Sequence, residues 1–121
     1  MTFHLRVLRV QGIYYVISGL WPLFHMASFE AITGPKVDDW LVRMVGLLAA
    51  VIGMTLLVAV RRRSRELELL VLAVGSALAF AAVDIWNALG GVISRLYLAD
   101  AAVELSIVLL LLGTARSSRA M

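Results

Sequence analysis

Three of the eight acidic residues of this chain, Asp84, Asp100 and Glu104, lie within stretches that are otherwise apolar. A charged side chain in such a stretch is costly when the stretch crosses a membrane, so it usually marks a function or a specific pairing. Carboxyls can bind cations, carry protons, or act as general acids and bases. These three acids are therefore the first candidates for a functional site.

Helical spacing places the candidate side chains on shared faces. Tyr97, Asp100 and Glu104 are separated by three and four residues, which puts them on one helix face, and Asp84 shares a face with Asn87 in the same way. With a rise of about 1.5 Å per residue, Asp84 and Asp100 lie at similar depth, whereas Glu104 lies near the middle of its apolar stretch. Glu104 must therefore be protonated, paired or hydrated.

If both faces point inward, the acids meet the guanidinium of Arg43 and the imidazole of His25. These groups then surround the outer mouth of a pocket. We expect this pocket to bind a small or lipidic molecule or a cation, with Glu104 as its proton-sensitive centre. In this hypothesis Arg43 orients the ligand and His25 gates or relays protons. The full candidate site, including two tryptophans as apolar walls, is Glu104, Asp100, Asp84, Arg43, His25, Asn87, Tyr97, Trp21 and Trp86.

The elements that must position these residues are four apolar blocks in a chain of 121 residues, of which 62% are hydrophobic. Each block approaches the roughly 20 residues that cross a hydrocarbon core of about 30 Å. Short connections make consecutive helices antiparallel neighbours. The prediction is an all-α, integral membrane, four-helix up-down-up-down bundle, a single domain over residues 1–121 with helices at 10–29, 40–60, 67–89 and 93–114.

The basic residues indicate an orientation and a location. Because lysine and arginine concentrate on the cytoplasmic side, we expect both termini to be cytoplasmic and the embedded acids to lie in the outer half of an inner membrane. The first apolar block lacks a small-x-small cleavage site, so we expect it to be retained. Eight arginines fall on the predicted inner side: Arg6, Arg9, Arg61, Arg62, Arg63, Arg65, Arg116 and Arg119.

Composition narrows the chemistry and the partners. The chain has no cysteine, which excludes disulfides, thiol redox chemistry and thiolate metal ligation. We expect no metal, because no short ligand motif joins His25 to the acids, and no cofactor or nucleic acid, because lipid headgroups account for the basic charge. Catalytic motifs are also missing, although acid/base catalysis on a lipid stays an alternative, since a neutral Glu beside His and Asp suffices for an isomerisation.

A structural alternative explains the same residues without a ligand. Arg43 would pair with Asp84 or Asp100, and a neutral Glu104 would bond a hydroxyl of Tyr14, Tyr15 or Ser18, so that the charges only fix helix packing in an accessory subunit. Small residues permit close approach of two helices, either within one bundle or in a homo-oligomer. They lie on one face of the second block, at Gly46, Ala50 and Gly53.

Three segments of the first half resemble a pattern found in small four-helix bacterial membrane proteins of uncharacterised function. The segments are Gly19-Leu20-Trp21-Pro22, Thr33-Gly34-Pro35-Lys36 and Trp40-Leu41-Val42-Arg43. The resemblance implies a bacterial inner-membrane protein. It implies no activity.

Overall fold

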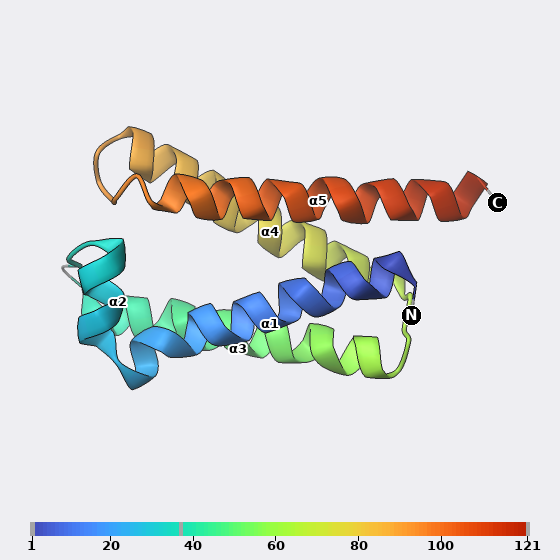
Figure 1. Ribbon diagram of the computed structural model, residues 1–121, viewed down its shortest axis with the longest axis horizontal. Coiled ribbons are helices and arrows are strands. Elements are labelled where there is room, and N and C mark those ends of the chain that lie inside the picture. The colour runs from blue at the N-terminus through green and yellow to red at the C-terminus, as the bar shows by residue number, and fades with distance from the viewer. Residues whose placement is uncertain (1, 37, 121) are drawn as a thin grey trace.

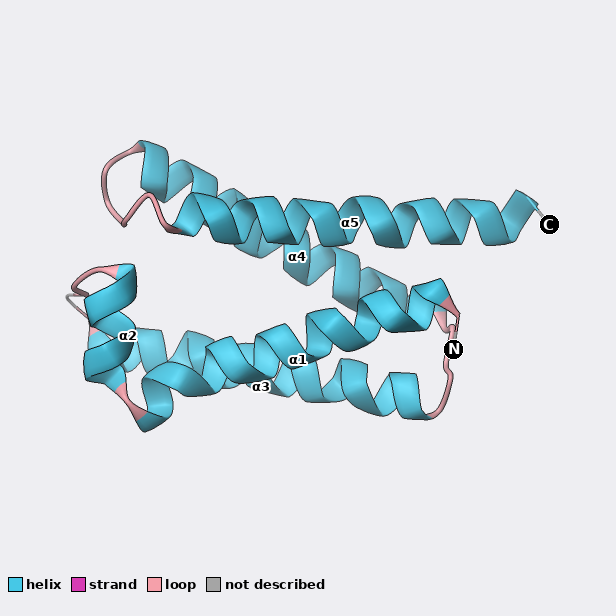
Figure 2. Cartoon of the chain, viewed as in Figure 1, coloured by secondary structure: helices cyan, strands magenta, loops and turns pink. Residues whose placement is uncertain are grey.

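The computed structural model describes residues 2–36 and 38–120, the last six of these by their backbone alone. The side chains of Arg116 and Arg119, which contributed to the predicted orientation, lie outside the described residues. The described chain is helical throughout and has no strand, which confirms the all-α prediction (Figures 1 and 2). Its helices are α1 (Phe3–Phe24), α2 (Met26–Thr33), α3 (Asp39–Arg61), α4 (Leu67–Leu89) and α5 (Tyr97–Ala120).

Three helices are long and apolar enough to cross a membrane: α3, α4 and the Tyr97–Thr114 part of α5. This finding indicates a membrane protein. The fourth predicted span is not among these three. It falls mainly in α1, where Arg9, Gln11 and two consecutive tyrosines lower the hydropathy.

The prediction of one helix over residues 10–29 was wrong. The chain breaks at His25, which has an extended backbone with φ −153°, and α2 begins at the next residue. Nδ1 of His25 accepts a 3.1 Å hydrogen bond from the Ser28 N–H and so caps α2. Pro22, three residues earlier, has no N–H to donate, which weakens the last turn of α1 and favours its end here.

The long helices form two antiparallel pairs rather than a ring of consecutive neighbours. α1 packs against α3, and α4 packs against α5 (Figure 1). Contacts between α1 and α5 join the two pairs, whereas α3 and α4 contact each other little although they follow one another in the chain. The bundle is therefore organised around α1.

Glycines bring α1 and α3 into backbone contact. A Cβ atom added to Gly53 would lie 2.6 Å from the carbonyl oxygen of Gly12, and one added to Gly12 would lie 2.9 Å from the carbonyl oxygen of Gly53. Gly19 and Gly46 face each other at least as closely, two turns along. The small residues predicted on the second block thus pack within one chain.

An aliphatic core fills the end of the molecule that holds both termini and the connection from α3 to α4 (Figure 1). Leu8, Leu56 and Leu111 are its largest fully buried members. A 3.3 Å hydrogen bond between His4 Nδ1 and Thr114 Oγ1 joins α1 to α5 at this end. The embedded acids lie beyond this core, toward the other end of the helices.

Candidate functional site

Two neighbouring tyrosines of α1 hold the two acids of α5. The Tyr14 hydroxyl donates a hydrogen bond to Oδ1 of Asp100. The Tyr15 hydroxyl donates one of 2.7 Å to Oε1 of Glu104, a pairing that the structural alternative predicted. Because Asp100 and Glu104 are one helical turn apart, two consecutive residues of α1 are enough to bind both.

Glu104 lies in a closely packed interior. Only 1% of its surface and 2% of the surface of Tyr15 are exposed. The Tyr15 ring meets Phe80 of α4 edge to face, with the ring centroids 5.3 Å apart. An unpaired negative charge in such surroundings is costly, and the neutral hydroxyl of Tyr15 offsets only part of that cost.

Asp84 brings the third acid to the same place from α4. It is 6% exposed, and its Oδ2 atom is buried without a hydrogen-bond partner. Its carboxyl lies close enough to Asp100 and Glu104 to interact with their charges. We call these three residues, Asp84, Asp100 and Glu104, the acid cluster.

The acid cluster has more hydrogen-bond acceptors than the neighbouring donors can satisfy. The hydrogen bonds described above come from tyrosine hydroxyls, which are neutral, and Asp84 Oδ2 receives none. Three negative charges close together, two of them on buried side chains, repel each other strongly, so the cluster is most stable with bound protons or a small cation. The arrangement can therefore hold and exchange protons.

Gln11 extends this polar interior and was missed by the sequence analysis. Its side chain is fully buried, its Nε2 donates a 2.9 Å hydrogen bond to the carbonyl oxygen of Ala73, and its Oε1 has no partner. Gln11 lies one helical turn before Tyr15, so both residues share the face of α1 that meets α4 and α5. An amide at that spacing from a buried tyrosine is the signal that could have identified it.

Two predicted members of the site, Arg43 and His25, lie away from the acid cluster. Arg43 is exposed on α3, the helix that packs mainly against α1. His25 is exposed at the break between α1 and α2, where its ring nitrogen is used as a helix cap. The break directs the chain sideways before His25 can enter the bundle, which is why the predicted meeting with the acids does not occur.

The remaining predicted residues also make other contacts. Trp86 is 82% exposed, so it forms no wall of an enclosed pocket. Trp21 donates a 2.8 Å hydrogen bond from Nε1 to Ser28 Oγ, and Asn87 donates one of 2.8 Å to the carbonyl oxygen of Val83. Tyr97 lies beneath the ammonium group of Lys36, which is 5.1 Å from its ring centroid. The structure thus brings together the three acids of the predicted site but not their predicted partners.

A second pair of carboxyls, Glu30 of α2 and Asp39 of α3, lies at the end of the helices near Tyr97. Each is half-buried and has one enclosed oxygen without a hydrogen-bond partner. A proton shared with Asp39, together with partial burial, raises the pKa of the Glu30 carboxyl. The positive charge of Lys36 lowers the pKa of Glu30, but by less than Asp39 and burial raise it.

Within the described residues, no three His, Asp or Glu side chains are arranged so as to hold a metal ion. No protein-family model matches the chain, and no curated protein or solved structure matches it significantly.

Proposed function

We propose that this chain is a small integral membrane protein that crosses a bacterial inner membrane with α1, α3, α4 and α5. The arginines near the termini and in the α3–α4 connection favour a cytoplasmic position for that end of the helices. The acid cluster then lies toward the outer side. It binds a small cation, or a small lipidic molecule with a cationic group, in exchange for a proton.

One observation carries this proposal: the buried carboxyls of Asp84 and Glu104 lie between α1, α4 and α5 beside the partly exposed carboxyl of Asp100. Tyr14 and Tyr15 donate to Asp100 and Glu104, whereas Asp84 Oδ2 has no partner. A proton is the smallest group that satisfies such an oxygen. A cation that displaces the proton gains contact with more than one carboxyl, so protons and cations compete for the same space. This competition is the basis of proton-coupled binding and transport in membrane interiors.

Access to the acid cluster requires α1 and α5 to separate, because Tyr14 and Tyr15 close the space between these helices. Protonation of an acid weakens the hydrogen bond that its tyrosine donates, and loss of the proton strengthens that bond. Ligand entry and helix movement are therefore linked through the same two tyrosines.

Proton release on addition of a cation tests the proposal. Purified protein in neutral detergent and weak buffer is mixed with Na⁺ or tetramethylammonium chloride, and a pH indicator reports the protons released. Wild-type protein should release protons, and Asp84→Asn should release fewer. Asp38→Asn is the matched control, because Asp38 is exposed and lies outside the acid cluster.

The structural alternative is supported by the same bonds, since Tyr14 and Tyr15 use both acids of α5 to hold the two helix pairs together. In that account the cluster stays neutral and only fixes the packing of an accessory subunit. It predicts no proton release with either cation. The experiment above therefore separates the two functions.

A further inference from the structure

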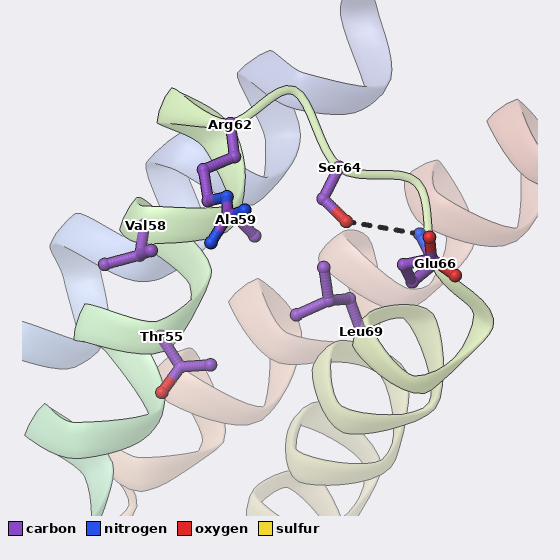
Figure 3. A pocket seen from close by; sticks show the side chains of 7 residues that line it. All are labelled: Thr55, Val58, Ala59, Arg62, Ser64, Glu66 and Leu69. Carbon is purple, nitrogen blue, oxygen red and sulfur yellow. Dashed lines mark hydrogen bonds between the residues drawn. The ribbon is translucent and has the colours of Figure 1, made fainter.

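An open cavity of about 490 Å³ lies between the last turns of α3 and the first turn of α4 (Figure 3). Pockets for small ligands typically have volumes of roughly 300–1,000 Å³, so this cavity is large enough to bind one. Its lining is separate from the acid cluster and consists of Thr55, Val58, Ala59, Arg62, Ser64, Glu66 and Leu69.

The cavity exists because α3 ends abruptly. Arg63 has a left-handed backbone with φ 52°. Its N–H donates a 3.0 Å bond to the carbonyl oxygen of Val60, and the Ser64 N–H donates a 2.9 Å bond to that of Ala59. This pair of bonds ends a helix and turns the chain from its axis. Since α4 begins only at Leu67 and contacts α3 little, the space between the helices stays open.

Polarity changes along the depth of this cavity. Arg62 and Glu66 are exposed at its mouth. Thr55 lies seven residues before Arg62 on α3, about 10 Å deeper by helical rise. Between these levels the wall is apolar at Val58 and Leu69, and Figure 3 shows Leu69 projecting from α4 toward this space. The hydroxyl of Thr55 is already bonded to a backbone carbonyl at 2.9 Å, so the deep wall offers little polarity to a ligand.

Charge and membrane position define the occupant. Both helices that form the cavity are long and apolar enough to cross a membrane, so its mouth lies at the level of the lipid headgroups. Arg62 and Glu66 are the charged residues of the cavity lining. The connection beside the mouth has a positive balance, because Arg61, Arg63 and Arg65 are exposed there against Glu68. A phosphate ester with an apolar chain fits a positive mouth above an apolar wall.

We propose that the cavity binds one anionic phospholipid with a hydroxyl-bearing headgroup, for which phosphatidylglycerol is the simplest probe. The phosphate binds Arg62, whose guanidinium forms charge-assisted hydrogen bonds with phosphate oxygens. The Glu66 carboxylate accepts hydrogen bonds from the headgroup hydroxyls. One acyl chain lies along Val58 and Leu69. This site is independent of the function proposed for the acid cluster.

Lipid titration in neutral detergent tests this site, with native mass spectrometry and the melting temperature as readouts. Phosphatidylglycerol should form a one-to-one adduct and raise Tm, and phosphatidylcholine of the same chain length should do neither. Arg62→Gln should weaken phosphatidylglycerol binding at least about tenfold, the loss expected for a hydrogen bond to a charged group. Arg9→Gln, the same charge change at an exposed position of α1, should alter it less than about twofold.

Three results would overturn the proposal. Equal binding of the two lipids would exclude recognition of the anionic headgroup. Equal losses in Arg62→Gln and Arg9→Gln would reduce the effect to general attraction between charges. Stabilisation by inorganic phosphate alone, at the same concentration as the lipid, would show that the apolar wall contributes nothing. Leu69→Trp, which fills the cavity, should block the adduct while Arg62 is intact.

Discussion

At the scale of residues, the main finding is that hydroxyl groups, not cations, bind the embedded acids. Tyr14 and Tyr15 each donate to one carboxyl of α5, and Asp84 keeps a buried oxygen without a partner. Neutral donors do not balance the negative charge of the acid cluster, and this distinguishes the cluster from a permanent ion pair.

Tyr15→Phe tests the central contact of this interior. The change removes only the hydroxyl that donates to Glu104 and leaves a buried carboxyl without its partner, so the free energy of unfolding should fall by about 1–3 kcal/mol. The melting temperature in detergent measures the loss. Tyr97→Phe is the control, because the contact described for Tyr97 is made by its ring. Equal melting temperatures for Tyr15→Phe and wild type would contradict this contact.

Glu30 predicts a pH dependence outside the spanning helices. Its pKa is raised above the ordinary value of about 4.5, because it shares a proton with Asp39 and is partly buried, so the folded state holds this proton more tightly than the unfolded state. The stability that this proton contributes is therefore fully present below that ordinary value and is lost as the pH rises through the raised pKa.

Glu30→Gln should flatten this dependence in melting temperatures recorded across the acid-to-neutral range. Glu68→Gln, at an exposed position in the first turn of α4, should leave it unchanged. The same pH dependence in Glu30→Gln and wild type would contradict a raised pKa at Glu30.

Sequence reasoning succeeded for residues that are chemically unusual in their surroundings. The cost of a carboxyl in an apolar stretch identified the acid cluster, and the spacing on α5 identified the shared face of Asp100 and Glu104. Gln11 gave no comparable signal, because an uncharged amide near a polar helix end is common. Arg43 and His25 were predicted from depth alone, and depth does not specify the direction of a side chain.

At the scale of elements, the boundaries of a helix could be predicted where charged residues and glycines lie at its ends. The prediction of residues 67–89 agrees with α4. The prediction of residues 10–29 failed because two local effects coincide, the missing N–H of Pro22 and the cap provided by His25, which together favour a break over a kink.

The backbone contact between α1 and α3 predicts a strong response to one methyl group. In Gly53→Ala the added carbon would lie 2.6 Å from the carbonyl oxygen of Gly12, so the helices must move apart, at a cost of about 1–3 kcal/mol. Gly75→Ala is the matched control, since a carbon added there meets nothing within 4 Å and alanine favours the helix. Melting temperatures in detergent that fall equally in both variants would contradict this packing.

At the scale of the whole molecule, two helix pairs meet along α1, and the acid cluster lies in the interface between them. The sequence predicted helix content and direction, but not this pairing. Short connections favour contact between consecutive helices, whereas the glycine contacts of α1 with α3 and the tyrosine contacts of α1 with α5 outweigh that preference. Both sets of contacts depend on which face of each helix meets its neighbour. The mean hydropathy of a segment does not identify that face.

The cavity at the α3–α4 connection follows from the same arrangement. Helices that separate at one end leave a space there, and Arg62 of the connection lines it. In the described residues the acid cluster and this cavity are separate features, and the two proposals can be tested independently.

The central claim is that the acid cluster holds a proton that a cation can displace. The most direct measurement counts the protons released near neutral pH when Na⁺ or tetramethylammonium is added to wild-type protein, Asp84→Asn and Asp38→Asn. The account predicts release of up to about one proton per wild-type chain, the same release from Asp38→Asn, and much less from Asp84→Asn. No release from folded wild-type protein with either cation, or equal release from all three proteins, would contradict it.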